Sequence, residues 1–140
     1  MNIRQIKYLL ILIFLFSGYS FADDLDGKGL TCVKNEESNL KKYSAYYFNK
    51  NRKVKFYNLK EIKDEIKIKY LNDFKYTNDK DFIKIFTNYS FYKINRKKLE
   101  IVSGKSNQCK LHNSLLDVFK QMNIYAKQEK KKLVNNNRGE

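Results

Sequence analysis

A polar turn between two strand-like runs, at residues 88–102, constrains the fold of this chain more than any other segment. Aromatic and β-branched residues flank the tetrapeptide Asn95-Arg96-Lys97-Lys98, which is the pattern of a β-hairpin. One choice of register gives the hairpin an apolar face and an opposite-charge pair on its outer face, an arrangement that stabilises paired strands. This register sets Ile94 opposite Leu99, Tyr92 opposite Ile101, Lys93 opposite Glu100 and Phe91 opposite Val102.

Similar short runs recur along the chain, separated by turns that depend on Asn and Asp because Gly is scarce. A second hairpin is predicted across residues 49–53, with Phe48 opposite Val54 and Tyr46 opposite Phe56. Residues 61–65 are expected to form a turn or one helical turn, and further turns are predicted at Asn72-Asp73 and Asn78-Asp79. The other predicted strands are residues 30–33, 66–70, 74–76, 82–86 and 109–111.

The period of the apolar residues changes after residue 113. Ser114 is a good N-cap, and apolar residues then recur at helical spacing, which predicts a helix over 114–132 and a disordered tail over 135–140. The chain is therefore expected to be mainly β: an antiparallel meander of seven or eight short strands forming a small barrel or strongly curved sheet, plus one C-terminal α-helix. An open sheet with the helix across one face is the alternative.

The first residues resemble an export signal. Arg4 and Lys7 precede an apolar run over residues 8–16, and Ser20-Phe21-Ala22 fits a small-residue cleavage site. We therefore expect a signal peptide over 1–22, a single β-rich domain over 23–134, and a periplasmic or secreted protein. An uncleaved anchor is the alternative, although the apolar run is shorter than the roughly 20 residues of a membrane-spanning helix.

Cys32 and Cys109 are the only cysteines of the chain. In an exported protein two such residues are expected to form a disulfide, which here would tie the first strand to the last. Two buried free thiols are the alternative.

The chain carries a net charge of +14, and 25 of its 29 basic residues are Lys. This composition is what AT-rich codons produce, so the charge is either drift on a solvated surface or an attraction to an anionic partner. The scarcity of Arg argues against specific phosphate recognition, and export argues against a nucleic-acid partner.

The sequence offers little for catalysis. His112 is its only histidine, and we find no carboxylate pair, phosphate loop or cluster of metal ligands. We therefore expect a protein that is not an enzyme and that needs no cofactor or metal. A hydrolase built from a clustered Asp, Tyr and His112 is a further hypothesis.

The chain is rich in aromatic residues, with 11 Tyr and 10 Phe. They either fill the core or line a cavity or groove with tyrosine hydroxyls as polar handles. The candidates for a ligand or partner surface are Tyr43, Tyr47, Tyr57 and Tyr89, which fall on the faces opposite the predicted core. We expect a monomer that binds an apolar ligand or an anionic envelope component. The alternative is an inhibitor or interaction module that acts through the basic loop 49–53.

Two segments resemble those of a group of small exported proteins from AT-rich marine bacteria. One is the Asp-Gly-Lys-x-Leu-x-Cys opening at residues 26–32, in which Gly29 fills the first variable position. The other is the Ile-Asn-Arg-Lys-x-Leu-Glu hairpin at residues 94–100. That group has no established activity, so the resemblance implies a class and no function. A more distant likeness, in architecture alone, is to periplasmic lysozyme inhibitors, which are small disulfide-closed barrels.

Overall fold

The computed structural model of this chain describes residues 2–6, 25–35, 41–102 and 107–138. The predicted signal segment, residues 1–22, lies outside the described residues except for positions 2–6, so export stays a prediction. Within the described ranges, no helix has both the length and the hydropathy of a membrane-spanning segment.

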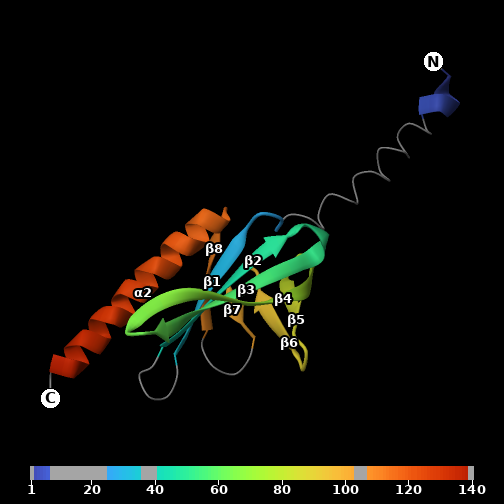
Figure 1. Cartoon of the computed structure of the whole chain (residues 1–140). Helices are drawn as coiled ribbons and strands as arrows, with labels where there is room; N and C mark the ends of the chain where they lie inside the picture. Colours follow the sequence, from blue (N-terminus) through green and yellow to red (C-terminus); the bar gives the residue numbers. More distant parts are fainter. Residues whose placement is uncertain (1, 7–24, 36–40, 103–106, 139–140) are drawn as a thin grey trace.

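Eight strands close into an antiparallel barrel in which each strand pairs with its neighbours along the chain and the first pairs with the last. The helix α2 (Leu115–Arg138) lies diagonally across the outside of this barrel (Figure 1). The predicted mainly β fold with a C-terminal helix is therefore confirmed, in its barrel form. The strands are β1 (Gly29–Asn35), β2 (Lys41–Asn49), β3 (Lys53–Ile62), β4 (Glu65–Asn78), β5 (Phe82–Phe86), β6 (Phe91–Asn95), β7 (Glu100–Ile101) and β8 (Asn107–His112).

The β2–β3 hairpin has the predicted register. Phe48 pairs with Val54, and both side chains are fully buried inside the barrel. Tyr46 pairs with Phe56, and their rings stack with centroids 5.1 Å apart. Aromatic pairs of this kind stabilise a sheet beyond the apolar area that they bury, which is why this register could be predicted from the sequence.

The predicted register of the β6–β7 hairpin is wrong by two residues. Ile94 pairs with Ile101 instead of Leu99, because Leu99 belongs to a wider turn and adopts a positive φ of 51°. The Asn95 side chain organises this turn by accepting hydrogen bonds from the backbone N–H groups of Lys97 and Lys98. A shift of two residues preserves the alternation of faces, so Ile94 still points inward.

The predicted pairs on the outer face of this hairpin change with the register. Lys93 does not meet Glu100. Its ammonium group lies over the Phe82 ring, 4.0 Å from the centroid, and Val102 donates a backbone hydrogen bond to the Lys93 carbonyl. Phe91 instead pairs with Phe86 on β5.

The predicted turn at Asn72-Asp73 is also wrong, because β4 continues through it to Asn78. The register against β3 shifts between Phe56 and Tyr57, so that Leu71 is an extra residue in a β-bulge. The turn that connects β3 to β4 is Lys63-Asp64, which confirms the turn predicted over residues 61–65. Both residues have positive φ, as a two-residue hairpin loop requires. An Asn-Asp pair has therefore marked a bulge instead of a turn.

Two apolar layers hold the molecule together. One fills the barrel and includes Leu30, Phe48 and Ile85. The other lies between the outer face of the barrel and α2, where Val118 and Met122 are fully buried. Successive side chains of a strand point to opposite faces of the sheet. In β1 to β4 the inward side chains fill the barrel, and the outward side chains are also apolar where α2 covers them.

The helix begins as predicted and ends later. The Ser114 hydroxyl caps it by accepting a hydrogen bond from the Asp117 backbone N–H. The helix then continues past residue 132 to Arg138, so residues 135–138 of the predicted tail are helical, while 139 and 140 lie outside the described residues.

The predicted disulfide joins Cys32 of β1 to Cys109 of β8, across 77 residues of sequence. The two cysteines are direct register partners at the seam where the first strand meets the last. The bond therefore closes the barrel covalently.

Candidate binding site at the open end of the barrel

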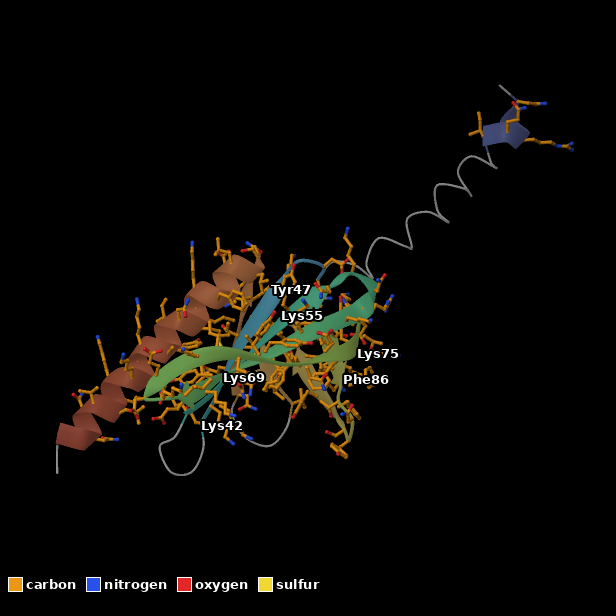
Figure 2. All side chains as sticks on the ribbon, viewed as in Figure 1. Lys42, Tyr47, Lys55, Lys69, Lys75 and Phe86 are labelled. Carbon is orange, nitrogen blue, oxygen red and sulfur yellow. A yellow bond between two sulfur atoms is a disulfide. The ribbon has the colours of Figure 1, made fainter. Side chains whose placement is uncertain are left out.

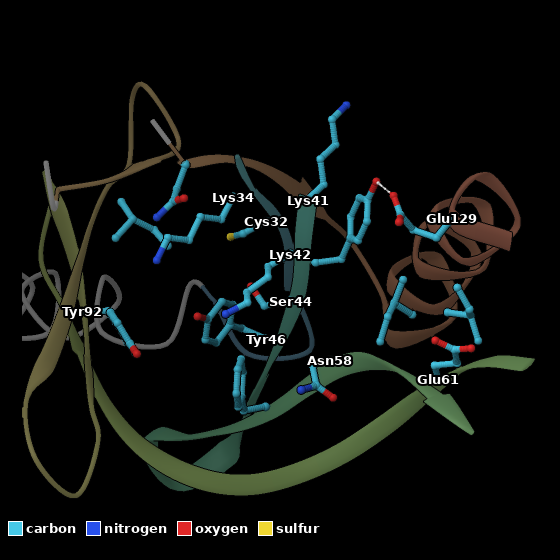
Figure 3. A pocket seen from close by; sticks show the side chains of 16 residues that line it. Cys32, Lys34, Lys41, Lys42, Ser44, Tyr46, Asn58, Glu61, Tyr92 and Glu129 are labelled. Carbon is cyan, nitrogen blue, oxygen red and sulfur yellow. Dashed lines mark hydrogen bonds between the residues drawn. The ribbon is translucent and has the colours of Figure 1, made fainter. Parts of the chain in front are cut away.

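The barrel wall opens between β2 and β3 at one end. Their pairing stops at Ser44 and Asn58, whereas β2 continues along β1 to Lys41 and β3 continues along β4 to Ile62. The two strands therefore diverge beyond this point. A cavity of about 480 Å³ occupies the opening and reaches into the barrel (Figure 3).

Strand register arranges the inward side chains of this end in three rows. At the rim lie Asn107, Lys34 and Lys42; one step deeper lie Cys109, Cys32, Ser44 and Asn58; below them lie Leu30, Tyr46 and Phe56. The rows run from cationic through polar to apolar. This gradient comes directly from the even-numbered positions of the first three strands, which alternate inward.

The rim carries two lysines that face each other across the β1–β2 ladder. Figure 3 shows the side chains of Lys34 and Lys42 extending into the cavity, whereas Lys41 points away from it. Like charges directly opposite each other on paired strands destabilise a sheet. Among the described residues, no carboxylate forms an ion pair with Lys34. An anion held between the two ammonium groups would be attracted by both.

The deeper part of the cavity is aromatic. Tyr46 stacks on Phe56, and Phe56 lies 5.8 Å from Phe74, ring centroid to ring centroid. Tyr92 contributes its ring and hydroxyl from β6 on the other side of the cavity (Figure 3). Burial raises the pKa of the Tyr46 hydroxyl to about 12, so the floor carries no charge at neutral pH.

Two side-chain amide groups in the cavity lining, those of Asn58 and Asn107, could accept hydrogen bonds from a ligand. The side-chain oxygens of Asn58 and Asn107 are buried, and neither accepts a hydrogen bond from the residues that the structure describes. Asn107 is only 6% exposed and lines the cavity beside Lys34. A buried polar atom without a partner costs stability, so these oxygens favour a guest that brings N–H or O–H groups.

The cavity also reaches the groove between β2 and α2. There the Tyr43 hydroxyl donates a 2.8 Å hydrogen bond to Glu129, which also accepts one from Lys132. Burial, and then the Glu129 carboxylate, raise the pKa of Tyr43 well above its usual value. This contact fastens the helix to β2 and forms the far wall of the opening.

The four tyrosines singled out from the sequence do not form one surface. Tyr43, Tyr47 and Tyr57 do lie on the outer face of the barrel, but α2 covers them and they pack in the outer apolar layer. Figure 2 shows Tyr47 beside its register partner Lys55 on this face. Tyr89 lies apart and is 99% exposed. Of the four, only Tyr43 lines the cavity at the open end.

Sequence reasoning missed the residues at the rim. Lys34, Lys42 and Asn107 were not singled out, because lysines at strand ends usually extend into solvent. The available signal was alternation: Leu30, Cys32 and Lys34 share one face, so an inward Leu30 implies an inward Lys34.

The described residues contain no group of three His, Cys, Asp or Glu side chains placed to hold a metal ion. His112 is half-buried and its Nε2 lies 2.8 Å from the Thr31 hydroxyl, and burial lowers the pKa of its imidazole. The basic loop 49–53 contains the turn η1 (Lys50–Arg52), at the opposite end of β2 from the open end.

No protein-family model, curated protein or solved structure matches this chain. The assignment of a function therefore depends on the barrel end itself.

Proposed function

We propose that this protein is a non-catalytic binding protein that holds a small anionic amphiphile in the open end of its barrel. The observation that carries the proposal is the pair of opposed lysines, Lys34 and Lys42, above an aromatic floor in one cavity. The ligand class joins the two expectations from the sequence, an apolar ligand and an anionic envelope component.

The head group of such a ligand would lie between the two ammonium groups. Charge–charge attraction is stronger at a partly enclosed rim than in bulk water, because less water screens it. The buried oxygens of Asn58 and Asn107 would accept hydrogen bonds from an amide or hydroxyl group next to the charge. An acyl amino acid or the head of an anionic lipid has this combination of groups.

The apolar part of the ligand would extend toward Tyr46 and Phe56. A volume of about 480 Å³ falls within the usual range for small-molecule sites. Contact with aromatic side chains contributes favourable free energy in proportion to the apolar area removed from water.

The compartment is part of the same proposal. The Cys32–Cys109 disulfide is typical of an oxidising environment, and it supports a periplasmic or secreted location together with the signal-like residues 1–22. A ligand from the cell envelope would be present there.

Calorimetric titration with N-dodecanoylglycine, below its micelle concentration, tests the proposal. This probe has a carboxylate, an amide N–H and an apolar chain, and we expect one saturable site. The variant Lys34→Gln/Lys42→Gln should bind it about tenfold or more weakly, because charge-assisted hydrogen bonds contribute about 1.5–3 kcal/mol each. Dodecanoate, which lacks the amide, should bind more weakly than N-dodecanoylglycine.

The matched control is Lys110→Gln, which removes an exposed lysine on the outer face of β8 and should leave the affinity unchanged. Dodecyltrimethylammonium has the same chain and the opposite charge, so it should not compete. Equal affinity for the cationic and anionic probes would refute the proposal, as would an unchanged affinity in the double variant.

A further inference from the structure

The turn between β5 and β6 carries exposed aromatic rings. Tyr89 is 99% exposed, Phe91 is 55% exposed and Phe86 is 42% exposed. Phe86 and Phe91 are register partners, with ring centroids 6.2 Å apart, and Tyr89 lies in the turn that joins them. Large apolar side chains gathered in this way on a surface usually mark an interaction site.

Local hydrogen bonds hold the turn in shape. The Thr87 backbone N–H donates to the Ser90 carbonyl at 2.8 Å, and the Thr87 hydroxyl donates to the same oxygen at 2.9 Å. The Ser90 N–H donates in return to the Thr87 hydroxyl at 3.1 Å. The Tyr89 ring is therefore presented on a closed turn, which lowers the entropy cost of placing it against a partner.

The charge around these rings is mainly positive, and the Asp79 carboxylate, which interacts with Lys84 and Lys93, is the acidic group near them. Residues 82–99 contain five basic residues and no Asp or Glu. Lys84 lies over the Phe91 ring at 5.8 Å from the centroid, and Lys93 lies over Phe82 at 4.0 Å. Figure 2 shows Phe86 beside Lys75, its register partner on β4. Rings and ammonium groups are thus interleaved on one outer face.

We propose that this aromatic turn, residues 86–91, docks on the surface of an anionic lipid bilayer. The Tyr89, Phe86 and Phe91 rings would enter the boundary between head groups and acyl chains, where aromatic side chains are favoured. Lys84, Lys93 and Lys75 would remain among the anionic head groups, where each lysine adds about 1 kcal/mol of attraction. Charge complementarity and the position of the rings on a protruding turn both point to this partner.

A nucleic acid fits this surface less well. Single-strand platforms present several rings along a groove that follows the backbone. Here the most exposed ring lies on the turn itself, and a soft bilayer surface can receive all three rings together.

Docking would bring the bilayer close to the proposed ligand site. Tyr92 follows the exposed Phe91 directly and lines the cavity at the open end. In Figure 1 the β5–β6 turn lies at the same end of the barrel as the paired ends of β1 and β2, Asn35 and Lys41. The membrane proposal does not depend on the ligand proposal, because the rings and lysines of the turn lie on the outer face.

Flotation of the full chain with lipid vesicles tests this inference. We expect binding to vesicles of phosphatidylcholine and phosphatidylglycerol, and little binding to phosphatidylcholine alone. Tyr89→Ser/Phe91→Ser should weaken binding about tenfold or more, since full burial of one large apolar side chain contributes about 1.5–3 kcal/mol. Lys84→Gln/Lys93→Gln should reduce the preference for phosphatidylglycerol about tenfold or more, and Lys75 should retain the remainder.

The matched control is Leu116→Ser, which removes another exposed apolar side chain, 63% exposed, at the beginning of α2. It should float like the unaltered protein. Unchanged flotation of the Tyr89/Phe91 variant would overturn the inference, and so would equal binding to both vesicle types or a stronger affinity for a single-stranded oligonucleotide. N-dodecanoylglycine binding should be unchanged in the Tyr89/Phe91 variant, which separates this test from that of the ligand site.

Discussion

Reduction of the Cys32–Cys109 disulfide should lower the free energy of unfolding by about 4–5 kcal/mol, which is the chain-entropy value for a loop of this length. The bond joins register partners on the first and last strands, 77 residues apart. Without it, closure of the barrel depends on β1–β8 pairing alone. Urea denaturation with and without a reductant measures the loss directly.

The matched control is the variant Cys32→Ala/Cys109→Ala. It should be as unstable as the reduced protein, and reductant should have no further effect on it. A loss below about 1 kcal/mol would mean that the strands close the barrel without help, since native disulfides in small domains typically contribute 2–5 kcal/mol.

Replacement of Gly29 by alanine should destabilise the protein by about 3 kcal/mol, the upper part of the usual range for overpacking. A Cβ atom at this position would overlap Val118 Cγ2 and would lie 2.9 Å from the Tyr46 carbonyl oxygen. The helix approaches β1 so closely here that only glycine fits. Either α2 must move off the barrel or the β1–β2 ladder must distort.

Gly27 provides the comparison for this prediction. It has a φ of +76° and nothing within 4 Å of an added Cβ atom, so Gly27→Ala should cost only the roughly 1–2 kcal/mol of a left-handed backbone. Gly29→Ala should cost less in a Val118→Ala background, because the closest contact is then removed. An equal cost for the two glycine variants in urea denaturation would contradict the packing explanation.

Much of the barrel could be predicted from short-range patterns. The β2–β3 register follows from the aromatic residues on one face, and the helix from its apolar spacing and its Ser114 cap. The errors in strand register and turn position arose at Asn residues, because an Asn side chain can stabilise more than one local backbone conformation. Asn72 belongs to a bulge instead of a turn, and Asn95 widens a turn so that Leu99 no longer pairs.

The site was harder to predict because it depends on contacts between distant segments. Lys34 and Lys42 point inward, and they line a cavity only because β2 and β3 diverge beyond Ser44 and Asn58. The outward direction of Tyr43, Tyr47 and Tyr57 was correctly predicted, yet α2 covers them. That cover depends on the close approach of Val118 to Gly29, which no local pattern reveals.

The central claim is that the open end of the barrel is a binding site, and NMR titration of the protein with N-dodecanoylglycine tests it most directly. The account predicts saturable shift changes at Lys34, Lys42 and Asn107 on the rim, and at Tyr46, Phe56 and Tyr92 deeper in the cavity. Shifts that do not saturate, or that are confined to the turn at residues 49–53 or to the outer surface of α2, would contradict it.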